Sequence, residues 1–229
     1  MSFQYEYPRP AVTVDAVVYG YQAAEMRVLL IERGEAPFRG AWALPGGFLN
    51  ENEDLPDAVR RELLEETGVA PLHLEQLGSW GTPGRDPRGH TVTVAYTALV
   101  RMSDHRASAA TDAADARWFA VDALPDLAFD HGEILDAARR RLIESVRTRP
   151  VGFDLLPDQF TLTELQSLVE TVLGDALDKR NFRKKLQSLD MLIPTGEFET
   201  GVSHRAAQLY RFDRAMYEKL SAEGFQFRL

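Results

Sequence analysis

Three glutamates, Glu62, Glu65 and Glu66, lie within five positions of the chain. Side chains three and four positions apart share one face of a helix, so a helix here would crowd three like charges. Pairs at i and i+4, such as Glu62 and Glu66, cost roughly a few tenths of a kcal/mol in an isolated helix. A divalent cation would remove this repulsion, because Mg²⁺ and Mn²⁺ prefer hard oxygen ligands and keep positions for water and phosphate. The spacing therefore points to a metal site that acts on a phosphorylated substrate.

The residues around these glutamates could position them. Gly46 and Gly47 let the backbone pass close to a metal without a Cβ, and the carbonyl of Gly46 could join the metal ligands. Arg61 and Glu53 are expected to form an ion pair that ties the preceding loop to the helix. The competing interpretation is a solvated helix surface, since charge runs are common on exposed helices.

A helix over about residues 55–67 is predicted to carry the glutamates. Asp54 can cap its N-terminus, Pro56 suits its first turn, and Gly68 fits its C-terminal stop. One side of this helix should face a hydrophobic core. The apolar stripe consists of Leu55, Ala58, Val59 and Leu63.

Segments with the composition of β-strands lie on both sides of that helix. Residues 11–20 and 26–32, joined by a short polar stretch, predict a hairpin or two adjacent strands that start an antiparallel sheet. Three further strands, LEQLGSWG, HTVTVAYTALV and ARWFAV, precede a helix predicted over about 132–148. Strands flanked by helices predict an α/β sandwich.

Composition narrows the class of protein. A chain of 229 residues suits two domains, and 45% hydrophobic with 27% charged residues is ordinary for globular domains. Cysteine is absent, which excludes disulfides, thiolate metal sites and cysteine nucleophiles. No apolar run reaches the roughly 18 residues that a membrane span requires, and the N-terminus has no signal-peptide pattern. We therefore expect a soluble, cytoplasmic protein with no membrane partner.

Charge is unevenly distributed along the chain, whose formal net charge is −9. Residues 1–149 hold 16 Arg and Lys against 23 Asp and Glu, a difference of −7, and residues 150–229 hold 10 against 12, a difference of −2. All four lysines lie in the second part. A stretch with two prolines and a glycine at 148–159 indicates a linker or docking segment. The sequence thus predicts two domains, 1–149 and 150–229.

The second part has the element order of a winged helix. Thr161 and Glu164 form a capping-box pattern, Gly174 would end the first helix, and Asp178 would cap a second. Two short strands about Gly201 would follow as a hairpin. Helix, helix and hairpin together predict a winged-helix domain.

The second helix and the hairpin supply candidate DNA contacts. Basic side chains there could contact phosphates and base edges of double-stranded DNA. The alternative is an amphipathic helix whose basic residues are only solvated. The candidates are Lys179, Arg180, Asn181, Arg183, Lys184 and Lys185 in the helix, with His204 and Arg205 at the wing tip.

Nine specified positions within 23 residues form one continuous pattern: Gly47, Glu53, Arg61, Glu62, Leu63, Glu65, Glu66, Gly68 and Val69. This pattern resembles a complete Nudix box. The resemblance implies an α/β/α sandwich that binds Mg²⁺ or Mn²⁺ and hydrolyses a nucleoside diphosphate linked to another moiety. It also implies that Glu62, Glu65 and Glu66 are metal ligands and that Glu53, Arg61 and Gly68 are structural residues of the box.

The family's general base varies in location and cannot be transferred by position. His131 and Glu133, in the segment FDHGEIL, are the catalytic candidates. The alternative for both is an ordinary helix start with polar capping residues.

Substrate contacts are expected in a turn-rich loop. Arg85, Asp86 and Arg88, together with Gly47, are the candidates, because forked guanidinium donors suit a diphosphate or a ribose. This loop resembles that of Nudix proteins directed to ADP-ribose. A solvated turn is the alternative.

The segments FTLTELQ, LDKRNFRKKL and RAAQLYRF resemble the winged helix of Nudix-related transcriptional regulators, including NrtR-type repressors of NAD metabolism. The resemblance implies a homodimer that binds a DNA operator and responds to ADP-ribose or a related nucleotide, which it would also hydrolyse. One alternative is a non-catalytic repressor that senses ADP-ribose or a sugar. A second is a plain Nudix pyrophosphohydrolase whose winged helix does not bind DNA.

Overall fold

The computed structural model describes residues 6–71, 73–102, 113–188, 191–201, 203 and 205–228. The chain divides into two compact units, one of residues 1–20 and 27–139 and one of residues 21–26 and 140–229. The dividing point between residues 139 and 140 falls inside helix α2 (His131–Thr148). The domain boundary predicted between residues 149 and 150 stays a prediction.

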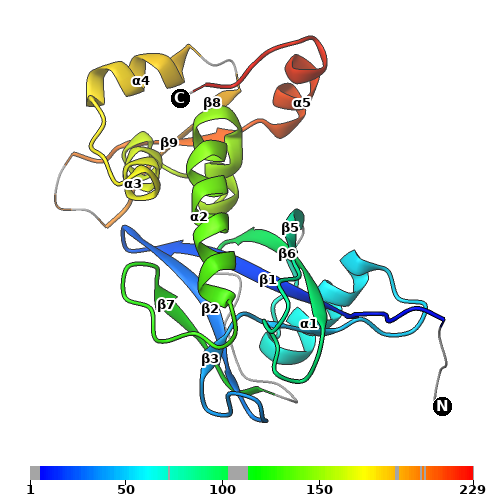
Figure 1. The fold of residues 1–229 in the computed structure, drawn as a ribbon. Helices are drawn as coiled ribbons and strands as arrows, with labels where there is room; N and C mark the ends of the chain where they lie inside the picture. Colours follow the sequence, from blue (N-terminus) through cyan, green and yellow to red (C-terminus); the bar gives the residue numbers. More distant parts are fainter. Residues whose placement is uncertain are drawn as a thin grey trace. The chain divides into compact units, whose positions relative to one another are not determined.

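The first unit is built on a seven-stranded sheet in the order β3-β2-β1-β6-β5, with β4 paired to β1 and β7 paired to β2 (Figure 1). A two-residue turn joins β1 to β2, and both its residues, Ala23 and Ala24, have positive φ, as hairpin turns of type I′ require. The strands are β1 (Ala11–Gln22), β2 (Glu25–Arg33), β3 (Trp42–Ala43), β4 (Gly46–Phe48), β5 (Glu75–Trp80), β6 (Thr91–Val100) and β7 (Ala113–Ala120).

The predicted antiparallel sheet is corrected to a mixed one. β1 pairs with β6 in parallel over ten residues, from Ala11 with Thr91 to Gly20 with Val100. Parallel neighbours need a long crossover connection, and the chain between β1 and β6 is long enough to provide one. The pattern of single strands carries no information about this pairing.

Helix α1 (Leu55–Thr67) has the predicted bounds. Asp54 caps it by accepting a hydrogen bond from Leu55 N, and Gly68 ends it in the left-handed conformation with φ of 69°. Its buried stripe packs against the even-numbered positions of β1. The core formed there contains Val14, Ala16, Val18, Ala58, Val59 and Leu63.

The first residue of α2 lies on the other face of the sheet. His131 approaches Asp15, an odd-numbered residue of β1, with 3.5 Å between Nε2 and Oδ1. Helices on both faces of the sheet confirm the predicted α/β/α sandwich. In the described part of the chain, no helix combines the length and apolarity needed to cross a membrane.

The second unit contains the predicted helices and hairpin in the predicted order. Thr161 and Glu164 complete the capping box of α3, and Asp178 Oδ1 accepts from Asn181 N at 2.7 Å to cap α4. The predicted linker forms a packed 3₁₀ helix, and the ring of its Phe153 stacks on Phe212 with 4.2 Å between centroids. The elements are η1 (Pro150–Leu155), α3 (Leu162–Leu173), α4 (Lys179–Gln187), β8 (Leu192–Phe198), β9 (Gln208–Phe212) and the unpredicted α5 (Arg214–Ala222).

Candidate functional site

The Gly46–Gly47 segment lies where β4 pairs with β1. A Cβ on Gly46, whose φ is 156°, would lie 2.1 Å from the carbonyl oxygen of Val14. A Cβ on Gly47 would lie 2.3 Å from Oε1 of Glu62. The two glycines were predicted to leave room for a metal. The structure shows that they leave room for the neighbouring strand and for the Glu62 carboxylate.

Substitution by alanine should therefore lower the stability of the protein at Gly46 more than at Gly47. Gly46→Ala meets backbone on the paired strand, which cannot move without breaking the sheet, so we expect a loss of stability of about 3 kcal/mol or more. Gly47→Ala meets only the end of a flexible side chain, so the fold should persist with Glu62 displaced. Thermal unfolding separates the two variants. Equal loss of stability in both would contradict this difference.

Arg61 holds the acidic residues of the box in place. Its Nε and Nη2 atoms donate to the two oxygens of Glu53 at 2.7 and 2.9 Å, which is the predicted ion pair. The side-chain hydrogen bond from Arg61 lowers the pKa of Glu53 to about 2. Nη1 also donates to Glu62 at 2.7 Å and to Glu65 at 3.2 Å. Arg61 therefore offsets part of the repulsion that the sequence assigned to a metal.

Glu66 is the member of the cluster that Arg61 does not contact. It is buried, and its Oε2 accepts from Gly46 N at 2.8 Å. Burial raises its pKa to about 8, and the neighbouring charge of Glu62 acts in the same direction. Burial also raises the pKa of Glu62. Two desolvated carboxylates thus lie side by side; Arg61 pairs with Glu62, whereas Glu66 accepts only the hydrogen bond from Gly46 N among the described residues.

A divalent cation fits this donor set. Of the described residues, no three His, Asp or Glu side chains form a ready-made metal cage. Mg²⁺ does not need one, because it commonly takes one or two carboxylates and completes its shell with water and substrate phosphates. Glu62 and Glu66 supply two desolvated carboxylates, whereas the Glu65 side chain is 49% exposed and turned to Arg61.

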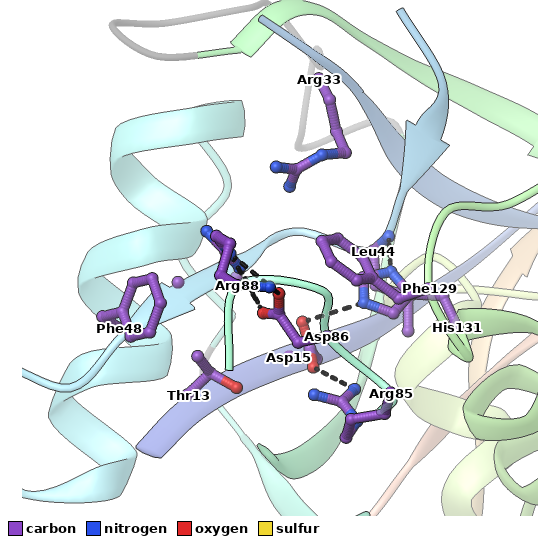
Figure 2. Close-up of a pocket in the computed structure, with 12 residues that line it drawn as sticks. Thr13, Asp15, Arg33, Leu44, Phe48, Arg85, Asp86, Arg88, Phe129 and His131 are labelled. Atoms are coloured by element: carbon purple, nitrogen blue, oxygen red, sulfur yellow. Dashed lines mark hydrogen bonds and ion pairs between the residues drawn. The ribbon is translucent and has the colours of Figure 1, made fainter. Parts of the chain in front are cut away.

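A pocket opens next to Gly46 and Gly47 within the first unit (Figure 2). Its lining combines cations, buried acids and aromatic rings. Residues from β1, β2, β4, the 81–90 loop and the start of α2 contribute to it. They are Thr13, Asp15, Arg33, Leu44, Gly46, Gly47, Phe48, Arg85, Asp86, Arg88, Phe129 and His131.

Arg85 lines the pocket, but its guanidinium is already occupied. Nε and Nη2 donate to the two oxygens of Asp130 at 2.8 and 2.6 Å, and only 4% of the side chain is exposed. Nη2 also lies 3.9 Å from Oδ2 of Asp15. The predicted role of Arg85 as a substrate clamp is therefore corrected to that of a buried support.

His131 reaches the pocket but is not placed to act as a base. Its Nδ1 accepts a hydrogen bond from Leu44 N at 2.9 Å, and its Nε2 faces Asp15. Burial lowers the pKa of His131, so the imidazole is neutral with its proton on Nε2. Glu133, the second predicted base, is exposed and does not line the pocket. Neither side chain offers a lone pair to a water in the pocket.

Two other arginines face the pocket together with aromatic rings. Arg88 pairs with Asp86, and hydrogen bonds from Arg88 lower the pKa of Asp86 even though burial opposes this. The Arg88 Cζ lies 4.8 Å from the centroid of the Phe48 ring. The Arg33 Cζ lies 4.8 Å from the centroid of the Phe129 ring.

Arg33 is a cation without an acidic partner among the described residues. Its Nε donates to Pro37 O at 2.8 Å, and no ion pair to a described carboxylate is formed. Burial lowers its pKa, and the nearby charge of Arg88 lowers it further. A half-buried guanidinium with unused donors is ready to receive an anion.

In the second unit, α4 presents a basic surface. Phe182 and Leu186 are buried, whereas Lys179, Arg180, Asn181, Lys184 and Lys185 are exposed. Arg183 differs from these because its Nη2 donates to Thr163 Oγ1 at 3.0 Å, which ties it to α3. At the predicted wing tip Arg205 is exposed, and His204 lies outside the described residues.

Asp15, Arg33, Phe48 and Phe129 are pocket residues that the sequence analysis did not select. Asp15 could have been selected, because it is the one charged residue in the apolar segment AVTVDAVVYG. Burying a charge in a strand lowers stability, so such a residue is a candidate for a functional role. Arg33 and the two phenylalanines lie at strand ends or in loops, where their residue types are common.

Comparison with known proteins assigns both units. Residues 9–138 match the family model of the NUDIX domain, and residues 152–212 match that of the NrtR DNA-binding winged helix domain. The chain is 37% identical over 217 residues to the ADPR responsive transcriptional repressor NtrR of Acinetobacter baylyi, covering 93% of this chain and 86% of that protein.

Two further similarities concern an enzyme and a DNA complex. The chain is 40% identical over 129 residues to an ADP-ribose pyrophosphatase of Methanocaldococcus jannaschii, covering 56% of this chain and 73% of that protein. The crystal structure of Shewanella oneidensis NrtR complexed with a 27mer DNA has a TM-score of 0.78 and 36% identity, covering 94% of this chain and 97% of that one.

Proposed function

Because the chain belongs to the Nudix family and joins its Nudix domain to a winged-helix domain of the NrtR type, we propose that it is a transcriptional regulator that responds to ADP-ribose. The pocket beside Gly46 and Gly47 is the observation that carries the proposal. It combines an arginine that has no acidic partner among the described residues, the exposed ring of Phe48, and two glycines that adjoin the desolvated Glu66 and Glu62. The similarity to the A. baylyi repressor, whose name states its response to ADPR, supports the choice of ligand.

The pocket lining suits the parts of a nucleoside diphosphate. Arg33 and Arg88 lie on the side of the pocket where Phe48 and Phe129 present their rings (Figure 2). Guanidinium groups bind phosphate oxygens with strong, charge-assisted hydrogen bonds. An aromatic face that is exposed, such as the 44% exposed Phe48, can stack on a planar base. The diphosphate would lie at Arg33 and Arg88, beside Gly47 and the Glu62 carboxylate that faces it.

The same site supports hydrolysis of the bound diphosphate. When bound, a divalent cation would supply charge neutralisation of the diphosphate and activation of water for attack at phosphorus. Glu62 and Glu66 would hold it, with the carbonyl of Gly46 as a further ligand. Arg61 would keep Glu62 oriented through its hydrogen bond at 2.7 Å. The 40% identity to an ADP-ribose pyrophosphatase supports this reaction.

A non-catalytic sensor is the second candidate, and one observation favours it. Arg61 already neutralises Glu62 and Glu65, so those two carboxylates do not need a metal to coexist. In such a protein ADP-ribose would bind at Arg33 and Arg88 and would dissociate without being hydrolysed. Both candidates share the pocket and the DNA-binding unit, and they differ in whether AMP is released.

DNA binding is proposed for the exposed face of α4. Arg180 and Lys184 are one helical turn apart on the side opposite the buried Phe182 and Leu186. Such a face can enter a major groove and contact phosphates at its edges. We propose a homodimer, because a two-fold protein matches the symmetry of a palindromic operator.

The proposed function is tested with DNA from upstream of the gene itself and of neighbouring genes. We expect retarded migration of one specific fragment, and release of that fragment when ADP-ribose is added. Incubation with ADP-ribose and Mg²⁺ should produce AMP if the protein is an enzyme. Failure of ADP-ribose to bind, measured by calorimetry, would disprove the ligand assignment.

Replacing Arg33 with Gln should weaken ADP-ribose binding about 10- to 100-fold, since a hydrogen bond to a charged group contributes about 1.5–3 kcal/mol. The fold should persist, because Arg33 lies at the end of β2 and the change removes one hydrogen bond, to Pro37 O, and no ion pair with a described carboxylate. Calorimetric titration gives the affinity. Arg39→Gln is the matched control, since Arg39 is exposed and outside the pocket lining. Affinities within about twofold for both variants would show that Arg33 is not a ligand contact.

A further inference from the structure

Asp15 is a buried pocket residue with no part in the proposed metal or phosphate contacts. It is 6% exposed on β1, and its Oδ2 accepts a hydrogen bond from Thr93 Oγ1 at 2.6 Å. Its Oδ1 lies 3.5 Å from His131 Nε2. Figure 2 shows Asp15 between Arg85 and His131, both linked to it by dashed lines.

The surroundings fix the position of this carboxylate from three sides. Thr93 belongs to the paired strand β6. His131 is itself fixed by the hydrogen bond from Leu44 N to its Nδ1. Arg85 is fixed by its two hydrogen bonds to Asp130. Burying the Asp15 carboxylate in a strand costs desolvation free energy, and its contacts with His131 and Arg85 offset only part of that cost. Stabilisation of the fold alone therefore does not account for Asp15.

Asp15 retains capacity to accept hydrogen bonds. A carboxylate offers about four lone-pair directions, and the only hydrogen bond to Asp15 within the described residues is the one from Thr93. The contacts to His131 at 3.5 Å and Arg85 at 3.9 Å are longer than good hydrogen bonds. The Asp15 carboxylate is thus a rigid, desolvated acceptor in the pocket. A neutral hydrogen-bond donor of the ligand, such as a hydroxyl group, could bind to it.

We propose that Asp15 accepts hydrogen bonds from the hydroxyl groups of the terminal sugar of the ligand and thereby selects a nucleoside diphosphate that carries a sugar. This inference rests on the proposed function. Phosphates would be repelled by Asp15, whereas Arg33 and Arg88 attract them. The exposed ring of Phe48 suits the base at the pocket mouth. The terminal sugar is then the part of the ligand that reaches the buried acceptor.

Selectivity follows from the burial of Asp15. A ligand without the sugar hydroxyls would exclude water from the Asp15 carboxylate and offer it no hydrogen bond in return. The unsatisfied carboxylate would strongly weaken binding of that ligand. We therefore expect ADP-ribose to bind about 10- to 100-fold more tightly than ADP. In the Asp15→Asn variant this preference should fall to within about threefold, because ADP-ribose loses its acceptor while ADP loses an unfavourable charge.

The experiment is calorimetric titration of the full chain with ADP-ribose and with ADP in EDTA, so that hydrolysis does not consume the ligand. Glu133→Gln is the matched control, since it removes one charge from an exposed position outside the pocket lining. It should keep the preference of the wild type. An equal loss of affinity for both ligands in Asp15→Asn, or an unchanged preference, would overturn the inference.

A second measurement needs no variant and covers the case in which Asp15→Asn does not fold. The wild-type protein is titrated with an ADP-ribose analogue whose terminal sugar lacks its hydroxyl groups. Binding as weak as that of ADP supports the inference, and binding as tight as that of ADP-ribose overturns it. If the wild type binds neither ADP-ribose nor ADP, the proposed function itself fails, which is a distinct result.

Discussion

Replacing Glu66 with Gln should reduce Mg²⁺-dependent hydrolysis of ADP-ribose by about three orders of magnitude, because charge stabilisation by a catalytic metal contributes several kcal/mol and each 1.36 kcal/mol is tenfold in rate. Glutamine has the same shape and can still accept the hydrogen bond from Gly46 N. It lacks the charge that would hold a divalent cation next to Glu62. AMP release at saturating ADP-ribose measures the effect.

The stability of this variant provides an internal control. Burial and the neighbouring Glu62 raise the pKa of Glu66 to about 8, so in EDTA at neutral pH its side chain is already largely protonated. Replacing it with a neutral glutamine should therefore not lower the melting temperature. Asp57→Asn removes one charge from the same helix at a position 73% exposed and should leave hydrolysis unchanged. A Glu66→Gln enzyme as fast as wild type would rule out the proposed metal site. DNA release by ADP-ribose that persists in the variant would identify sensing as independent of hydrolysis.

The box could be predicted from the sequence because its determinants are local. Asp54 and Gly68 define the two ends of α1 by capping, and helical spacing alone brings Glu62 and Glu66 to one surface. The ion pair between Arg61 and Glu53 also spans only eight positions. Interactions of this kind depend on neighbours along the chain, so residue types and spacing are sufficient.

The pocket could not be predicted in the same way. It joins Asp15, Arg33, Arg88 and Phe129, which are far apart in the sequence and meet only through the pairing of strands. The parallel pairing of β1 with β6 sets Thr93 opposite Thr13, two positions from Asp15 and within hydrogen-bond reach of its carboxylate, and no pattern within either strand indicates that register. Tertiary contacts of this kind require the fold.

The sequence also did not predict the roles of side chains in the loops around the pocket. Arg85 was predicted to contact the substrate and His131 to act as a base; both line the pocket, but their side chains are bound to Asp130 and to Leu44 N respectively. Arg61 shows the same limit, since its additional contacts with Glu62 and Glu65 depend on side-chain directions. A sequence gives the type of a side chain, and its partners decide whether it binds, supports or reacts.

Reversing two charges on α4 should abolish specific DNA binding. The double variant Arg180→Glu and Lys184→Glu replaces two exposed cations on one face with anions, so two phosphate contacts are lost and repulsion is added. We expect the affinity for the operator to fall about 100-fold or more, and the slope of log K against log salt to shrink by about two. Phe182 and Leu186 remain buried, so the unit should stay folded.

Fluorescence anisotropy with a labelled operator at several salt concentrations measures both quantities. Lys219→Glu is the control, because it makes one such charge reversal at an exposed position on α5 of the same unit. ADP-ribose affinity should be equal in all three proteins, since the pocket lies in the other unit. Direct contacts from α4 would be lost only when Arg180 and Lys184 are changed. If Lys219→Glu weakened DNA binding as much as the double variant did, the net charge of the unit would explain the effect instead.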